Sequence, residues 1–187
     1  MDILKRINLL LEEEISLVEI ISLINRDCSK FLKGAGRNEL YRGTKDHKEF
    51  FFKGTVRKDR KPTDMPAPIT KDFNIEFEEE HGVANIRNIS LFASGSRATA
   101  SEYGKIYRIF PIGNYTYWWN PDVEDLYQYW TEERTILPEA YKNTDLIKAI
   151  KSDNEIMFVC DEYYAIDANF SKSYDYVIDR LKYGSSK

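Results

Sequence analysis

Three short segments combine residue types that could act on a substrate carrying phosphate and sugar groups. Residues 40–43 read Leu-Tyr-Arg-Gly, residues 92–96 read Phe-Ala-Ser-Gly-Ser, and residues 153–155 read Asp-Asn-Glu ahead of an apolar run. An arginine can hold phosphate oxygens with two parallel hydrogen bonds. A carboxylate can stabilise the positive charge that builds on a sugar when its glycosidic bond breaks, and a nearby serine can orient it.

Each of these residues also has a purely structural interpretation. Arg42 could form a surface ion pair, Ser94 could cap a helix, and Glu155 could be a solvated charge before a strand. We favour ligand binding for Arg42, because it lies between Tyr41 and Gly43 near a strand end. Ser94 can do both, whereas the ligand interpretation of Glu155 depends on the other two segments.

Together the three segments resemble the Arg-Ser-Glu class of ADP-ribosyltransferases. That family carries an arginine on an early strand, a Ser-Thr-Ser turn at the end of another, and Glu-x-Glu or Gln-x-Glu before a late strand. The resemblance covers residues 40–166, and the chain is also similar to small phage proteins and toxin-like bacterial transferases. The family's aromatic residue before the turn, and its helix with alanine and an aromatic-glycine end, match these residues: Phe92, Ala98, Ala100, Tyr103 and Gly104.

The resemblance implies that the chain transfers ADP-ribose from NAD, its cosubstrate, to a macromolecular acceptor. It implies that Glu155 is the catalytic carboxylate and that Asp153 assists at the acceptor. It also implies a fold of two small packed sheets, with the N-terminal helices outside the core. The residues expected to contact NAD are Arg42, Gly43, Ser94, Ser96 and Tyr103.

Two positions depart from the family pattern. Gly95 replaces the middle threonine of the serine turn, which removes one hydroxyl, and Asp153 stands where the family has Glu or Gln. Because Asp153 and Glu155 are two residues apart, strand geometry would place both side chains on one face. A carboxylate there can accept a proton or hydrogen bond from an incoming amine, so we expect a nitrogen nucleophile as acceptor.

A basic loop over residues 53–68 interrupts a chain whose net charge is −4. Its composition allows three interpretations: a nucleic-acid acceptor patch, a lid over the cosubstrate's phosphates, or a solvated loop. The patch places RNA or DNA narrowly ahead of a protein side chain as acceptor, although the acidic chain is not a general nucleic-acid binder. The acceptor-binding candidates are Arg57, Lys58, Arg60 and Lys61.

Length and composition predict one domain over residues 1–187, with N-terminal helices over residues 1–36 and the core over residues 37–187. The chain is 42% hydrophobic and 14% aromatic, which is enough to build a core without a metal or disulfide. Cys28 and Cys160 are expected as buried thiols, and no metal site is predicted.

No apolar run approaches the roughly 20 residues that cross a bilayer, so no membrane association is predicted. The N-terminus has no basic flank and apolar core of a signal peptide. We therefore expect the protein in the cytoplasm, and the resemblance to phage and toxin-like proteins implies that the cell is a bacterial host.

The pattern of elements predicts an α+β fold. The aromatic strand residues Tyr115, Tyr117, Trp118 and Trp119 are expected in the core. Predicted helices span residues 2–33, 70–81, 97–103, 121–130 and 171–183, and predicted strands span residues 40–43, 89–92, 105–110, 115–119, 156–160 and 163–166.

Two alternatives to ADP-ribosyl transfer remain open from the sequence. The protein could hydrolyse NAD with water as the acceptor, as a glycohydrolase toxin does. It could also be a non-catalytic binding module, in which the three segments are structural and the basic loop docks a partner. The sequence is also compatible with a neutralising partner protein.

Overall fold

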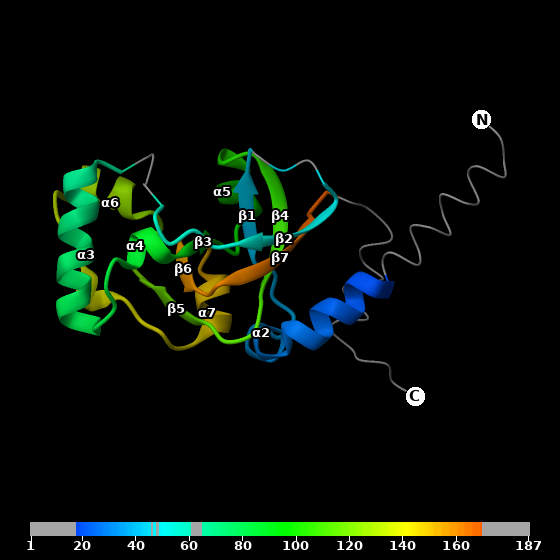
Figure 1. Cartoon of the computed structure of the whole chain (residues 1–187). Coiled ribbons are helices and arrows are strands. Elements are labelled where there is room, and N and C mark those ends of the chain that lie inside the picture. The colour runs from blue at the N-terminus through cyan, green and yellow to red at the C-terminus, as the bar shows by residue number, and fades with distance from the viewer. Residues whose placement is uncertain (1–17, 46, 48, 61–64, 170–187) are drawn as a thin grey trace, which may run out of the picture.

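The computed structural model describes residues 18–45, 47, 49–60 and 65–169. The fold is mixed α+β, with two small antiparallel sheets and several helices (Figure 1), and this confirms the predicted class. Helix 171–183 and the first part of helix 2–33 lie outside the described residues. Within the described ranges, no helix is long and apolar enough to cross a membrane.

The first sheet has four strands in the order β1 (Tyr41–Thr44), β4 (Lys105–Pro111), β7 (Glu162–Asp167) and β2 (Phe51–Thr55). All neighbours are antiparallel. Strand β1 lies at one edge of this sheet, and it carries Arg42.

The second sheet has the order β3 (Leu91–Ala93), β6 (Ile156–Val159) and β5 (Thr116–Trp119). Successive side chains of a strand point to opposite faces. Neighbouring residues of this sheet pack in two different clusters, so the sheet is buried on both sides. Trp118 packs in the cluster beneath α3, whereas its neighbour Trp119 packs in the larger core against the first sheet.

Helices surround the two sheets, and residues 18–27 form a further helical segment. Ile20 and Ile24 of this segment and Phe31 of the next helix are buried in the main core, so the expectation that the N-terminal helices lie outside the core is wrong for the described residues. Figure 1 shows α3 at one end of the molecule and residues 18–27 at the other. The helices are α2 (Ser29–Ala35), α3 (Ala67–His81), α4 (Ile86–Ile89), α5 (Arg97–Glu102), α6 (Leu126–Glu133), the 3-10 helix η1 (Pro138–Ala140) and α7 (Leu146–Lys151).

The edges of the two sheets meet at a backbone bridge. The amide of Tyr41 donates to the carbonyl of Ser94 at 2.7 Å, and the amide of Ser94 donates back to Tyr41 at 3.0 Å. Two of the three predicted site segments are therefore neighbours in space.

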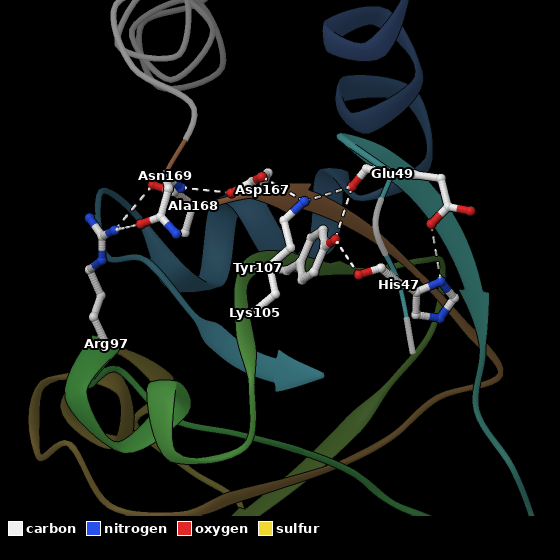
Figure 2. Close-up of polar contacts among 8 residues, drawn as sticks. All are labelled: His47, Glu49, Arg97, Lys105, Tyr107, Asp167, Ala168 and Asn169. Atoms are coloured by element: carbon white, nitrogen blue, oxygen red, sulfur yellow. Dashed lines mark hydrogen bonds and ion pairs between the residues drawn. The ribbon is translucent and has the colours of Figure 1, made fainter. Parts of the chain in front are cut away.

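A polar network joins the start of β4 to the end of β7 in the four-stranded sheet (Figure 2). The ammonium of Lys105 lies 2.8 Å from a carboxylate oxygen of Asp167, and the hydroxyl of Tyr107 donates to the carbonyl of Glu49 at 2.9 Å. Arg97, at the start of α5, donates to the residues that follow β7. These contacts fix β4 and α5, the two elements that flank β1.

Several sequence predictions need correction. The predicted loop 53–68 is wrong at both ends, because residues 53–55 belong to β2 and α3 begins at Ala67. Helix α6 begins at Leu126 rather than at residue 121, because Asp125 accepts from the amide of Gln128 and caps it. Helices α4 and α7 were not predicted, since four and six residues are too short to show periodicity.

The expected core residues are confirmed in most cases. Tyr115, Trp118 and Trp119 are buried, and Tyr117 is partly buried against the main core. Cys28 and Cys160 are buried free thiols, and burial raises the pKa of each thiol to about 12. Neither thiol is therefore suited to nucleophilic chemistry near neutral pH.

Gly95 allows α7 to approach the serine turn. A Cβ atom on Gly95 would lie 1.8 Å from the backbone carbonyl oxygen of Ile150, whereas one on Gly82 would meet nothing within 4 Å.

We predict that Gly95→Ala lowers the free energy of unfolding by about 3 kcal/mol, because a backbone carbonyl cannot move aside cheaply. Gly82→Ala, the matched control at positive φ, should cost only about 1 kcal/mol. Urea denaturation of both variants measures the difference, and equal losses would contradict the close approach.

Candidate active site

Arg42, Ser94 and Glu155 line one pocket, which also includes Gly43 and Tyr103. The pocket is open to solvent and lies beside the bridge that joins β1 to β3. Five of the seven residues assigned to catalysis or NAD therefore come together, although they come from segments far apart in the sequence. Ser96 and Asp153 do not line the pocket. The chemical roles of all seven stay predictions.

The pocket has charged and aromatic walls. Arg60 and Arg87 add two guanidinium groups to that of Arg42, and Glu124 and Asp125 contribute carboxylates near the start of α6. The aromatic walls are Tyr41, Phe92, Tyr103 and Tyr127, of which Tyr103 and Tyr127 are about 40% exposed. The site can therefore offer both cations for phosphates and ring faces for planar groups.

Arg42 reaches from β1 to the second sheet. Its Nη1 donates to the carbonyl of Phe92 at 2.7 Å, which holds the guanidinium against β3. Burial lowers the pKa of Arg42, while the nearby phenol of Tyr163 opposes that shift. Among the described residues, no carboxylate forms an ion pair with Arg42. A partly buried guanidinium without a carboxylate favours an anionic ligand.

Ser94 bonds differently from the sequence prediction. We expected its hydroxyl to orient Glu155 or a ribose, but it donates to the backbone carbonyl of Asp153 at 2.6 Å. It also accepts from the amide of Ser96 at 3.0 Å, which closes the turn. Ser94 thus binds the loop that carries Glu155 rather than the carboxylate itself.

Ser96 has a structural role in the described contacts. Its hydroxyl accepts from the amide of Thr99 at 3.2 Å, and it is the N-cap of α5. This bond satisfies one of the unpaired amides at the start of the helix. The cap fixes α5 directly after the serine turn.

The strand argument for Asp153 is wrong. Strand β6 begins only at Ile156, and Asp153 has a left-handed backbone with φ 63°. The alternation of an extended strand therefore does not apply to Asp153 and Glu155. Asp153 is exposed and does not line the pocket, and its backbone carbonyl is the group that meets Ser94.

Glu155 forms an ion pair with Arg87 that sequence reasoning missed. The Nη1 of Arg87 lies 2.9 Å from Oε1 of Glu155, and the two side chains are 8% and 19% exposed. Burial, the largest single influence, lowers the pKa of Arg87, but the charges of Glu155, Tyr141 and Asp125 raise it overall. Burial and the charge of Glu155 also raise the pKa of Tyr141.

The signal for Arg87 was weak but present. Arg87 stands between the apolar residues Ile86 and Ile89, and an arginine in such a setting needs a partner if it is buried. Nothing local indicates that the partner lies 68 residues later in the chain.

Hydrogen bonds to backbone carbonyls hold the loop before Glu155. The buried side chain of Asn154 donates to the carbonyls of Asn120 at 2.8 Å and Pro121 at 3.1 Å. The amide of Glu155 donates to the carbonyl of Glu124 at 2.9 Å. The side chain of Asn120 serves the loop before α6 rather than capping that helix, because its Oδ1 accepts from the amide of Asp122.

Gly43 lets α5 pack directly on β1. A Cβ atom on Gly43 would lie 1.9 Å from the carbonyl oxygen of Ala100 and 2.9 Å from the Cβ of Tyr103. The close approach brings Tyr103, at the end of α5, to the wall of the pocket beside Arg42.

The basic loop divides into separate environments. Arg57 pairs with Asp59 at 3.2 Å, and Lys58 pairs with Asp161 at 3.0 Å, and both cations are more than half exposed. Arg60 instead lines the pocket, with its guanidinium carbon 4.4 Å from the centre of the Phe92 ring. Lys61 lies outside the described residues.

Comparisons with protein-family models, curated proteins and solved structures found no match for this chain. In the part of the chain that the structure describes, no group of three or more His, Cys, Asp or Glu side chains could hold a metal ion. The chemistry of the pocket therefore has to be argued from its own residues.

Asn154 offers a test of how the loop before Glu155 is held. We predict that Asn154→Ala lowers the free energy of unfolding by about 1–3 kcal/mol, because the buried carbonyl of Asn120 and the partly buried carbonyl of Pro121 lose their donor. Asn114→Ala, at an exposed position, should change it by less than about 0.5 kcal/mol. Thermal and urea denaturation would measure both variants, and a neutral Asn154→Ala would contradict this role.

Proposed function

We propose that the protein is an ADP-ribosyltransferase, which transfers ADP-ribose from NAD to a macromolecular acceptor. The observation that carries the proposal is the meeting of Arg42, Ser94 and Glu155 in one pocket. The order of these residues matches the family that the sequence resembles. The pair of small antiparallel sheets is compatible with that family's fold, which we propose for this chain.

Arg42 suits the binding of the NAD diphosphate. Its guanidinium is fixed to the carbonyl of Phe92 by one nitrogen, and no carboxylate among the described residues neutralises it. A diphosphate would supply the missing negative charge, and a guanidinium fork can bind two of its oxygens. The rings of Tyr103 and Tyr127 line the same pocket, where they can stack on planar groups of the same ligand.

Glu155 suits the stabilisation of the transition state. When the bond between nicotinamide and ribose breaks, nicotinamide leaves with the bonding electron pair and positive charge develops on the sugar. A carboxylate near that sugar stabilises the charge more in the transition state than in the bound substrate. The acceptor nitrogen then forms the new bond to the sugar and loses its proton to solvent water.

Glu155→Gln is the direct test of this proposal. We predict that it lowers the rate of nicotinamide release by about a hundredfold or more, because the amide keeps the shape but loses the charge. Binding of NAD should change little, since Arg42 is untouched. Purified protein is incubated with NAD, and nicotinamide release and ADP-ribose attachment are followed separately.

Glu76→Gln on α3 is the matched control, because it is the same substitution at an exposed side chain that does not line the pocket. It should keep nicotinamide release within about threefold of the wild type, as expected of a surface change. Release without attachment to any macromolecule would establish NAD hydrolysis instead. Absence of release and attachment would leave a binding module and refute the proposal.

For the acceptor, we propose a nucleic acid. Arg57 and Lys58 are exposed, and Arg60, only two residues further along the chain, reaches the pocket. A phosphate backbone that contacts the first two residues would thus lie close to the reactive centre. The carboxylates of Asp59 and Asp161 reduce the local charge, which suits brief contact rather than tight binding.

Charge reversal of the exposed loop tests the nucleic-acid proposal. We predict that Arg57→Glu with Lys58→Glu lowers labelling of RNA or DNA by about tenfold at moderate salt, because phosphate contacts are lost. Lys33→Glu with Lys148→Glu, both exposed and away from the pocket, is the matched control. Treating the labelled products with nuclease or protease identifies the acceptor, and label that only protease releases would contradict the proposal.

A further inference from the structure

We propose that Arg87 is the positioning residue for Glu155. The sequence had suggested this role for Ser94. The inference rests on the proposed function, since it concerns how the catalytic carboxylate is held. The inference goes beyond the proposed function because it assigns a role to a residue that lies outside the three site segments.

The contacts of Ser94 and Arg87 distinguish them. The hydroxyl proton of Ser94 is donated to the carbonyl of Asp153, so it does not reach the carboxylate. The Nη1 of Arg87 binds Oε1 of Glu155 at 2.9 Å. Among the described residues, Oε2 of Glu155 has no hydrogen-bond partner, which leaves that oxygen for a ribose hydroxyl.

Arg87 is itself held firmly from the side of α3. Its backbone amide donates to Oδ1 of Asn74 at 3.0 Å, and the amide group of Asn74 donates to Asn88 at 2.6 Å. Its guanidinium carbon lies 4.7 Å from the centre of the Phe92 ring and 5.8 Å from that of Phe73. A side chain fixed by its own neighbours can impose one orientation on its partner.

Glu155 is held in place by contacts that do not involve Arg87. The backbone of Glu155 is bonded to Glu124, and the preceding Asn154 is bonded to Asn120 and Pro121. The ion pair therefore joins two segments that are each fixed already, so little freedom is lost when it forms. Its function is to select one rotamer of the carboxylate in a partly buried pocket.

A double-mutant cycle with nicotinamide release as the readout tests this inference. Arg87→Met is expected to lower kcat by about 10- to 100-fold, with KM for NAD within about threefold, because a misplaced carboxylate affects the transition state more than NAD binding. In the Glu155→Gln background, the same substitution should change kcat by less than about threefold, since no carboxylate remains to be held.

Two further variants complete the experiment. Arg87→Lys keeps the charge, and since only Nη1 binds Glu155, it should restore kcat to within about tenfold of the wild type. Arg26→Met, which breaks an exposed pair with Asp27 outside the pocket, should leave kcat unchanged. Near-UV circular dichroism checks folding. If Arg87→Met does not fold, the cycle is run with Arg87→Lys, whose smaller loss should likewise vanish in the Glu155→Gln background.

The outcomes separate the inference from the proposed function. Independent, additive losses from Arg87→Met and Glu155→Gln would overturn the positioning role, and so would a loss confined to KM, which would make Arg87 a ligand-binding residue. If the wild-type protein releases no nicotinamide at all, the proposed function fails and the inference fails with it.

Discussion

The backbone bridge between Tyr41 and Ser94 is the contact on which the pocket depends. It joins the edge of a four-stranded sheet to the edge of a three-stranded one through two hydrogen bonds of 2.7 and 3.0 Å. Paired edges also hide backbone groups that would otherwise be exposed. Because Arg42 follows Tyr41 directly, the same bridge sets its guanidinium against Phe92. The site is therefore a product of how two sheets meet.

Arg42 and Arg87 both line the pocket, but their positive charges are compensated in different ways. Arg87 has a carboxylate partner in Glu155, whereas the described part of the chain gives Arg42 only the Phe92 carbonyl and the nearby Tyr163 phenol. Burying a charge without a counter-charge is costly, so folding alone does not account for Arg42. A bound anion would supply that counter-charge, which is why the proposed function assigns the phosphates to Arg42 and the sugar to Glu155.

Local patterns predicted the elements that local forces determine. The class of fold, most strands and helix α3 followed from apolar periodicity, and the three site segments came from their order and setting. Asp153 and Arg87 could not be placed this way. The left-handed residue Asp153 bonds through its carbonyl to Ser94, 59 residues earlier, and the partner of Arg87 lies 68 residues away. Both features arise from packing between distant segments, which no local pattern contains.

The serine turn, α7 and the loop before Glu155 form one unit. Gly95 admits the last turn of α7, because any Cβ there would meet the carbonyl of Ile150. The chain then leaves α7 through Ser152, whose hydroxyl donates to the carbonyl of Ala149 at 2.8 Å, and turns at Asp153 to meet Ser94. The two contacts lie three residues apart along the chain, at Ile150 and at Asp153, so both join the end of α7 to the serine turn. The glycine at the centre of the serine turn is thus the residue that lets the turn hold the loop before Glu155 through the backbone.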